Sequence, residues 1–140
     1  MVNANLEKAK MLLNINDHTC VFCDGQTILT DKRRGVRSLL DILESGRNVS
    51  DFSAADKVVG KAAAFLYCLL GVKYLYARVI SQSALDVLVN AQVHVEYDQL
   101  VPAIRNRTND GFCPMEQAVW NITDPASALS AIYDALSKLN

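Results

Sequence analysis

The fold is decided by residues 56–80, which read DKVVGKAAAFLYCLLGVKYLYARVI. The part from Lys57 to Leu70 is apolar enough for a buried helix, and Asp56 in front of it suits a helix N-cap. Gly71 then ends the helix, because glycine accepts the left-handed conformation of a C-cap. The run from Lys73 to Ile80 is rich in tyrosine, valine, leucine and isoleucine, so it predicts a strand in the centre of a sheet.

Helices and strands alternate along the rest of the chain in an order typical of α/β proteins. A hairpin followed by β-α-β units builds a mixed sheet covered by helices. We therefore predict one α/β domain over residues 1–140. The predicted helices are 5–13, 36–43, 81–90 and two that begin at 114 and 125; the predicted further strands are 18–23, 26–30 and 92–97, with polar loops at 47–53 and 98–112.

The composition excludes several classes of protein. Of the 140 residues, 51% are hydrophobic and 21% charged, which is typical of a folded domain rather than a disordered chain. The net charge of −1 gives no basic footprint, so we expect no nucleic-acid partner. The longest apolar run, Ala62 to Leu70, is too short to span a membrane, and the N-terminus lacks a signal-peptide pattern. We expect a cytoplasmic protein.

The four cysteines are expected to be reduced in that compartment. Cys20 and Cys23 form a C-x-x-C, but they lie on a predicted strand, where positions three apart point to opposite faces. A zinc ribbon needs a second such pair, and the chain has none. We interpret this pair as core packing.

The expected start of the buried helix carries residues that weaken a helix. Lys57 and Lys61 add positive charge where the helix dipole is already positive, and Gly60 costs about 1 kcal/mol relative to alanine. Spaced four apart, the lysines share a helix face and suit an anion such as phosphate or carboxylate. Two alternatives stay open: a partly buried lysine that acts as a base or nucleophile, and lysines that extend into solvent behind an Asp56 cap.

A second candidate site is Cys113-Pro114-Met115-Glu116. A cysteine at a helix start can act as a nucleophile, and Glu116 can bond back to the helix start as in a capping box. Asn106 and Arg107, in the loop before it, can hold a carboxylate, a phosphate or a base edge. The alternatives are a small buried cysteine, a proline that starts a helix, and solvated loop side chains.

Together these residues resemble an uncharacterised bacterial family of unknown function that has a cytidine-deaminase-like fold. The resemblance rests on Asp56–Ala62, Asn106-Arg107 and Cys113–Glu116, and it spans nearly the whole chain, including Arg34-Gly35-Val36. It implies a three-layer α/β/α sandwich with a mixed sheet. It implies no established activity.

The deaminase comparison has a chemical consequence. Zinc deaminases carry H-x-E at the start of one helix and P-C-x-x-C at the start of the next. By analogy these positions fall at Ala55-Asp56-Lys57 and near Ser81-Gln82-Ser83-Ala84, where neither histidine nor cysteine stands. We therefore expect no zinc, no other metal and no cofactor.

Two classes of function remain open. The first is a metal-independent site that binds or acts on a small anionic, nucleotide-like ligand, with Lys57 and Lys61 holding the anion, Asp56 exchanging protons and Cys113 as nucleophile. The other residues predicted to bind the ligand are Gly60, Ser81, Asn106, Arg107 and Glu116. The second class is a non-enzymatic interaction or regulatory domain, including a homodimer that buries the strand of Tyr74 and Tyr76.

Overall fold

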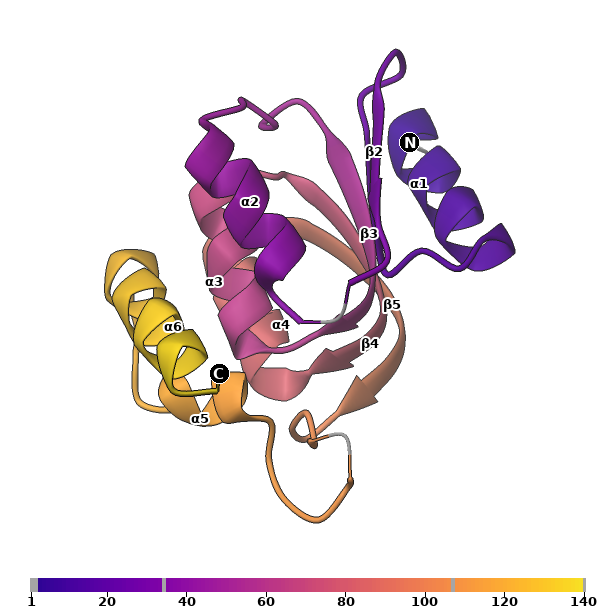
Figure 1. Ribbon diagram of the computed structural model, residues 1–140. Helices are drawn as coiled ribbons and strands as arrows, with labels where there is room; N and C mark the ends of the chain where they lie inside the picture. The colour runs from indigo at the N-terminus through magenta and orange to yellow at the C-terminus, as the bar shows by residue number, and fades with distance from the viewer. Residues whose placement is uncertain (1–2, 34, 107, 140) are drawn as a thin grey trace.

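A mixed five-stranded sheet forms the centre of the protein (Figure 1). The computed structural model describes residues 3–33, 35–106 and 108–139. The helices are α1 (Ala4–Ile15), α2 (Arg37–Ser45), α3 (Lys61–Leu70), α4 (Gln82–Asn90), α5 (Pro114–Ala118) and α6 (Pro125–Leu139), and the strands are β1 (Cys20–Cys23), β2 (Ile28–Asp31), β3 (Ser53–Val59), β4 (Tyr74–Ser81) and β5 (His94–Val101).

The strands are ordered β2-β1-β3-β4-β5 across the sheet. Strand β1 is antiparallel to both β2 and β3, whereas β3, β4 and β5 run parallel to one another. The predicted hairpin and the predicted β-α-β units are therefore confirmed. In the register, Cys20 pairs with Asp56 and Asp56 with Ala77, so these residues form one row across the sheet.

Helices cover both faces of the sheet, which gives three layers (Figure 1). On one face, α1 packs on β1 and β3 and buries Leu6, Ala9 and Leu13 against the sheet. On the other face lie α2, α3 and α4, and α6 packs outside them on α3. The expected α/β/α layering is thus present, with unequal outer layers.

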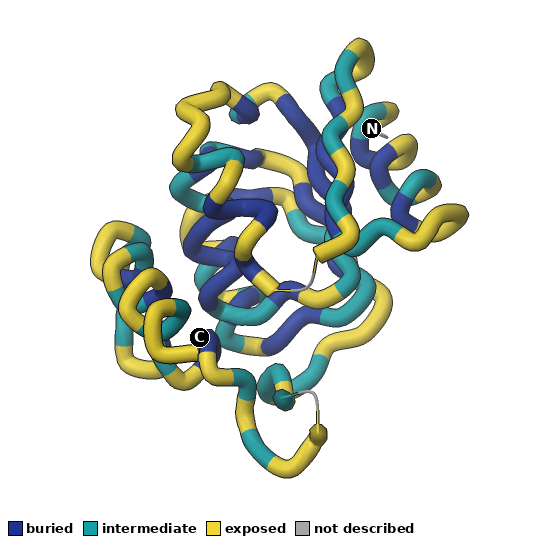
Figure 2. Tube along the Cα trace, viewed as in Figure 1, coloured by how far each residue is buried: buried dark blue, intermediate teal, exposed yellow. Residues whose placement is uncertain are grey.

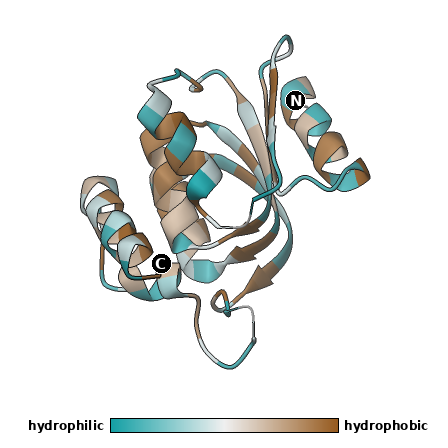
Figure 3. Cartoon of the chain, viewed as in Figure 1, coloured by the Kyte–Doolittle hydropathy of each residue, from teal (hydrophilic) through white to brown (hydrophobic). Residues whose placement is uncertain are grey.

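Helix α3 is the centre of the larger core. Every residue from Ala62 to Tyr67 is buried, and so is Leu70, because α2, α4, α5, α6 and the sheet surround the helix (Figure 2). The side of α3 that Figure 3 shows is mostly hydrophobic, and the sequence KAAAFLYCLL has hydrophobic residues on every face, as a helix enclosed on all sides requires. The predicted buried helix is therefore confirmed in its body and at its C-terminus.

The predicted N-terminus of this helix is wrong. The helix begins at Lys61, and the residues before it form β3, which includes both Asp56 and Lys57. The alanines in this segment favour a helix locally, but the segment pairs with β1 on one side and β4 on the other. Ala54 and Ala55 face opposite cores, so hydrogen bonding and burial on both faces outweigh the local preference. Asp56 is consequently not an N-cap; Gly60 is.

Other boundaries follow the sequence closely. Gly46 and Gly71 end α2 and α3 in the left-handed conformation, Ser81 caps α4, and Pro114 opens α5. The last predicted strand is longer than expected, because β5 continues into the polar segment as far as Val101. The C-x-x-C pair also behaves as predicted: its two cysteines are buried in opposite cores, and all four cysteines are free.

Candidate functional site

The starts of α3 and α4 lie side by side at the carboxyl edge of the parallel strands. The register pairs Val59 with Ile80, so Gly60 and Ser81 follow on neighbouring strands at the same level. Ser81 is completely buried, and its hydroxyl accepts a hydrogen bond from the main-chain N–H of Ala84 at 3.2 Å. Ligands of open α/β sheets bind at this edge, where helix N-termini point outward from the strands.

A carboxylate of the chain itself occupies the start of α3. The side chain of Glu116, on α5, is only 4% exposed. Burial raises the pKa of Glu116, while the main-chain N–H groups of Lys61 and Ala62 and the charge of Lys61 act in the opposite direction. These N–H groups have no partner within the first turn of a helix, so a buried carboxylate is a suitable acceptor for them.

Gly60 leaves the room that this carboxylate fills. A Cβ at residue 60 would lie 1.9 Å from Glu116 Oε1, 2.8 Å from Glu116 Cδ and 3.2 Å from Ile104 Cγ1. The backbone at Gly60 is extended, with φ −94° and ψ −179°, a conformation open to any residue. Close approach of Glu116, rather than backbone conformation, therefore accounts for the glycine.

Lys61 lies beside this carboxylate and connects it to an exposed aromatic pair. Its Nζ donates to the carbonyl oxygen of Trp120 at 3.1 Å and lies 5.7 Å from the centre of the Phe65 ring. Trp120 is 51% exposed, and its ring packs against Phe112 with 5.3 Å between ring centroids. The carboxyl edge thus combines a cation, main-chain donors and aromatic surface.

Asp56 lies deeper in the structure, facing the larger core. The hydroxyl of Tyr67 donates to Asp56 Oδ2 at 2.7 Å, and Cys20 Sγ lies 3.4 Å from the same hydroxyl oxygen. Burial raises the pKa of Asp56 to about 7, although the Tyr67 hydroxyl and nearby main-chain N–H groups act in the opposite direction. Tyr67 is not among the residues that the sequence predicts for a site, although a hydroxyl-bearing side chain on an otherwise apolar buried helix is a signal for one.

The structure separates several residues that were predicted to act together. Lys57 faces α1 and pairs with Asp17, with 3.5 Å between Nζ and Oδ1, so the shared helix face of Lys57 and Lys61 is a wrong prediction. Its cause is the misplaced helix start, because β3 directs these residues differently. Asp56 is four residues before Gly60 on an extended strand, about 13 Å from the carboxyl edge.

The predicted loop residues have separate positions as well. Asn106 donates to Asp110 at 2.9 Å and so closes its own loop. Cys113 is half-buried at the N-cap of α5, and its main-chain N–H donates to the carbonyl oxygen of Ile104. Arg107, like Arg34 in the family resemblance, lies outside the described residues. Gly60, Lys61, Glu116 and Ser81 are therefore the predicted residues that gather at one edge.

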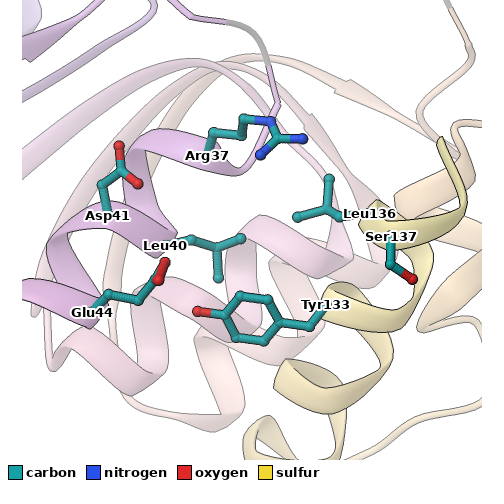
Figure 4. A pocket seen from close by; sticks show the side chains of 7 residues that line it. All are labelled: Arg37, Leu40, Asp41, Glu44, Tyr133, Leu136 and Ser137. Atoms are coloured by element: carbon teal, nitrogen blue, oxygen red, sulfur yellow. The ribbon is translucent and has the colours of Figure 1, made fainter. Parts of the chain in front are cut away.

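Two cavities lie away from this edge. One, of about 390 Å³, lies between α2 and α6, where Tyr133 points toward Glu44 (Figure 4). The other, of about 280 Å³, lies between the β1–β2 hairpin and α2 and opens onto Cys20.

In the described part of the chain, no three His, Cys, Asp or Glu side chains gather as metal ligands would. Nor does any helix described there have the length and hydrophobicity that a membrane span requires.

These features define an α/β protein with an open mixed sheet and a buried central helix, with a buried carboxylate of its own chain at the start of that helix. The sequence profile of the family described as a domain of unknown function, DUF1893, matches residues 8–136, and the chain belongs to this family. The crystal structure of a DUF1893 family protein (TM1506) from Thermotoga maritima is similar, with a TM-score of 0.85 at 27% sequence identity, covering 99% of this chain and 92% of that one. No protein with a curated description matches the chain.

Gly60→Ala tests the close approach of Glu116. We expect the substitution to lower the free energy of unfolding by about 2 kcal/mol or more, because the methyl group displaces a buried carboxylate from its donors. Glu116→Ala in the same background should recover part of the loss, with a coupling of about 1 kcal/mol or more in a urea-unfolding double-mutant cycle. Gly111→Ala, whose Cβ would meet only Asn106 at 3.4 Å, is the control. Equal effects of Gly60→Ala with and without Glu116 would contradict this explanation.

Asp56→Asn tests the buried carboxyl. Burial raises the pKa of Asp56 to about 7 in the folded protein, against the ordinary value of 3.8 for the unfolded chain, so its ionisation destabilises the fold as the pH rises between these values. The full shift corresponds to roughly 4 kcal/mol, and partial exposure reduces this, so we expect Asp56→Asn to be about 2 kcal/mol more stable than wild type at pH 8. At pH 4 the two proteins should unfold at similar urea concentrations. Exposed Asp51→Asn is the control, and a pH-independent difference would rule out this assignment.

Proposed function

We propose that this protein binds a small anionic, nucleotide-like ligand, without a metal, at the carboxyl edge of β3 and β4. The observation that supports this most is Glu116: a buried carboxylate already lies against Gly60 at the start of α3, near Lys61. A ligand phosphate or carboxylate that displaced Glu116 would face the free N–H groups of this helix start. Trp120 and Phe112 would offer apolar surface to a planar base.

The proposal gives different roles to the predicted residues. Lys61, Gly60, Ser81 and Glu116 belong to the binding site, and Cys113, three residues before Glu116, is the candidate nucleophile if a reaction takes place. Lys57 has no role in it, because it pairs with Asp17 on the other face of the sheet. Asp56 has no direct role either, because it lies well inside the sheet.

We further propose that the protein is a cytidine-deaminase-like domain that works without zinc. In that comparison the ligand positions of zinc deaminases correspond to the starts of α3 and α4. The first reads Gly60-Lys61-Ala62, more than one turn beyond the position expected from the misplaced helix start, and the second is Ser81-Gln82-Ser83-Ala84, as expected. No side chain there is a zinc ligand, so the residues do not fit the metal. The four free cysteines support a reducing compartment, the cytoplasm.

Ligand binding can be measured by calorimetry and thermal shift with nucleoside monophosphates and inorganic phosphate. Glu116→Gln should bind a phosphate ligand about tenfold more tightly than wild type, because the competing charge is gone. Lys61→Ala should bind the phosphate ligand about tenfold more weakly than wild type, because the cation is lost. Lys73→Ala is the matched control, because Lys73 is exposed at the opposite edge of the sheet. If neither wild type nor Glu116→Gln binds any of these anions, the proposal is wrong.

A homodimer is the second candidate, and the free edge of β5 favours it. Within the described residues β5 pairs with β4 alone, and Tyr97 and Leu100 on it are 42% and 40% exposed. Such an edge can pair with the same strand of a second copy. Of the two tyrosines proposed for an interface, Tyr74 is 39% exposed, whereas Tyr76 is buried against α1 and cannot contribute.

Light scattering tests the dimer. We expect twice the chain mass for wild type, and the monomer mass for Tyr97→Glu, because a charge at this edge prevents pairing with another strand. Val89→Glu, at an exposed apolar position on α4, should leave the dimer intact. A monomeric wild type at high concentration would exclude this candidate while leaving the ligand site open.

A further inference from the structure

The cavity between the β1–β2 hairpin and α2 combines an apolar wall with buried polar groups. Phe22 and Leu29 line it from the hairpin and Ile42 from α2, and its volume is about 280 Å³. Natural small-molecule sites have the same character: mostly apolar walls with a few polar groups that fix the orientation of a ligand. This cavity is separate from the carboxyl edge and independent of the function proposed there.

The floor of the cavity contains a thiol that is held in its neutral form. Cys20 is 4% exposed, and Ser38 beside it is 6% exposed. Tyr67 has a single hydroxyl hydrogen and donates it to Asp56, so the Cys20 thiol donates to the Tyr67 oxygen. Burial and the nearby charge of Asp56 raise the pKa of Cys20, so the group is a hydrogen-bonding floor rather than a nucleophile.

Among the described residues, Arg33 and Arg47 line the rim of the cavity, and their charges have different partners. Arg33 donates to Asp31 at 2.7 Å and to Asp41 at 2.5 Å, which joins β2 to α2. The positive charge of Arg33 is therefore already paired with carboxylates of the protein. Arg47 has no carboxylate within 4.0 Å among the described residues, and its guanidinium lies 5.8 Å from the Phe52 ring centre. One cation at the mouth is therefore available to an anion from outside.

We propose that this cavity binds a small monocarboxylate with an apolar body. The hydrocarbon or aryl body packs on Phe22, Leu29 and Ile42, and the carboxylate pairs with Arg47. A dicarboxylate or a phosphate fits less well, because the aspartates on the Arg33 side repel a second negative charge. A neutral molecule of the same shape lacks the Arg47 interaction and binds more weakly.

The experiment uses phenylacetate and hexanoate as probes, with phenylacetamide and hexanamide as neutral controls of the same shape. By calorimetry we expect the carboxylates to bind wild type at least about tenfold more tightly than the amides. Arg47→Gln should remove this difference, and Arg37→Gln, an exposed arginine of α2 that lines the other cavity, should preserve it. Both arginines are exposed, so both variants are expected to fold, as circular dichroism can check.

Thiol labelling locates the bound probe. Cys20 and Cys23 are both buried, but only Cys20 lines the cavity, and Cys23 belongs to the core on the opposite face of the sheet. Bound phenylacetate should slow the modification of Cys20 by N-ethylmaleimide severalfold more than that of Cys23, as peptide mass mapping can show. Equal protection of both cysteines, no binding at millimolar probe, or unchanged discrimination in Arg47→Gln would each overturn the proposal.

Discussion

The interaction on which this structure most depends is the carboxylate of Glu116 at the start of α3. A helix start leaves main-chain N–H groups without partners, and here the helix is enclosed by the sheet and by other helices. Its N-cap is Gly60, which has no side chain to supply an acceptor. The buried carboxylate of Glu116, on α5, lies against Gly60 and so holds α5 close to the end of β3. The burial of α3 and the position of α5 therefore depend on each other through Glu116.

The same arrangement explains the residues that are unfavourable for a helix. Lys61 lies beside a buried carboxylate, which offsets the repulsion between its charge and the helix dipole. Gly60 lies outside the helix, where its missing Cβ makes room for Glu116. The sequence pattern predicts an anionic ligand at this position, whereas the structure has a carboxylate of the protein itself there. A ligand at this edge therefore has to compete with an internal group.

A second polar system runs through the larger core, away from that edge. The register of β1 and β3 sets Cys20 beside Asp56, and Tyr67 reaches both from α3. Antiparallel pairing of β1 with β3 creates this contact between residues far apart in the chain. It gives the cavity under α2 a polar floor, and it places Asp56 where burial raises the pKa of its carboxyl to about 7.

The sequence by itself determined the fold class, most elements and their ends. Hydrophobic periodicity and helix-end residues act over one or two helical turns, so a short stretch of sequence is enough to predict their effect. The helix-end residues here are Gly46, Gly71, Ser81 and Pro114. Only the tertiary structure decided that Ser53–Val59 is a strand and that the carboxylate of Glu116 lies at the start of α3. Strand pairing on both sides and burial on both faces come from distant segments, and these outweigh the local preference of an alanine-containing stretch. Strand pairing decides which distant residues come together at a site, and the spacing of residues along the chain does not predict that pairing.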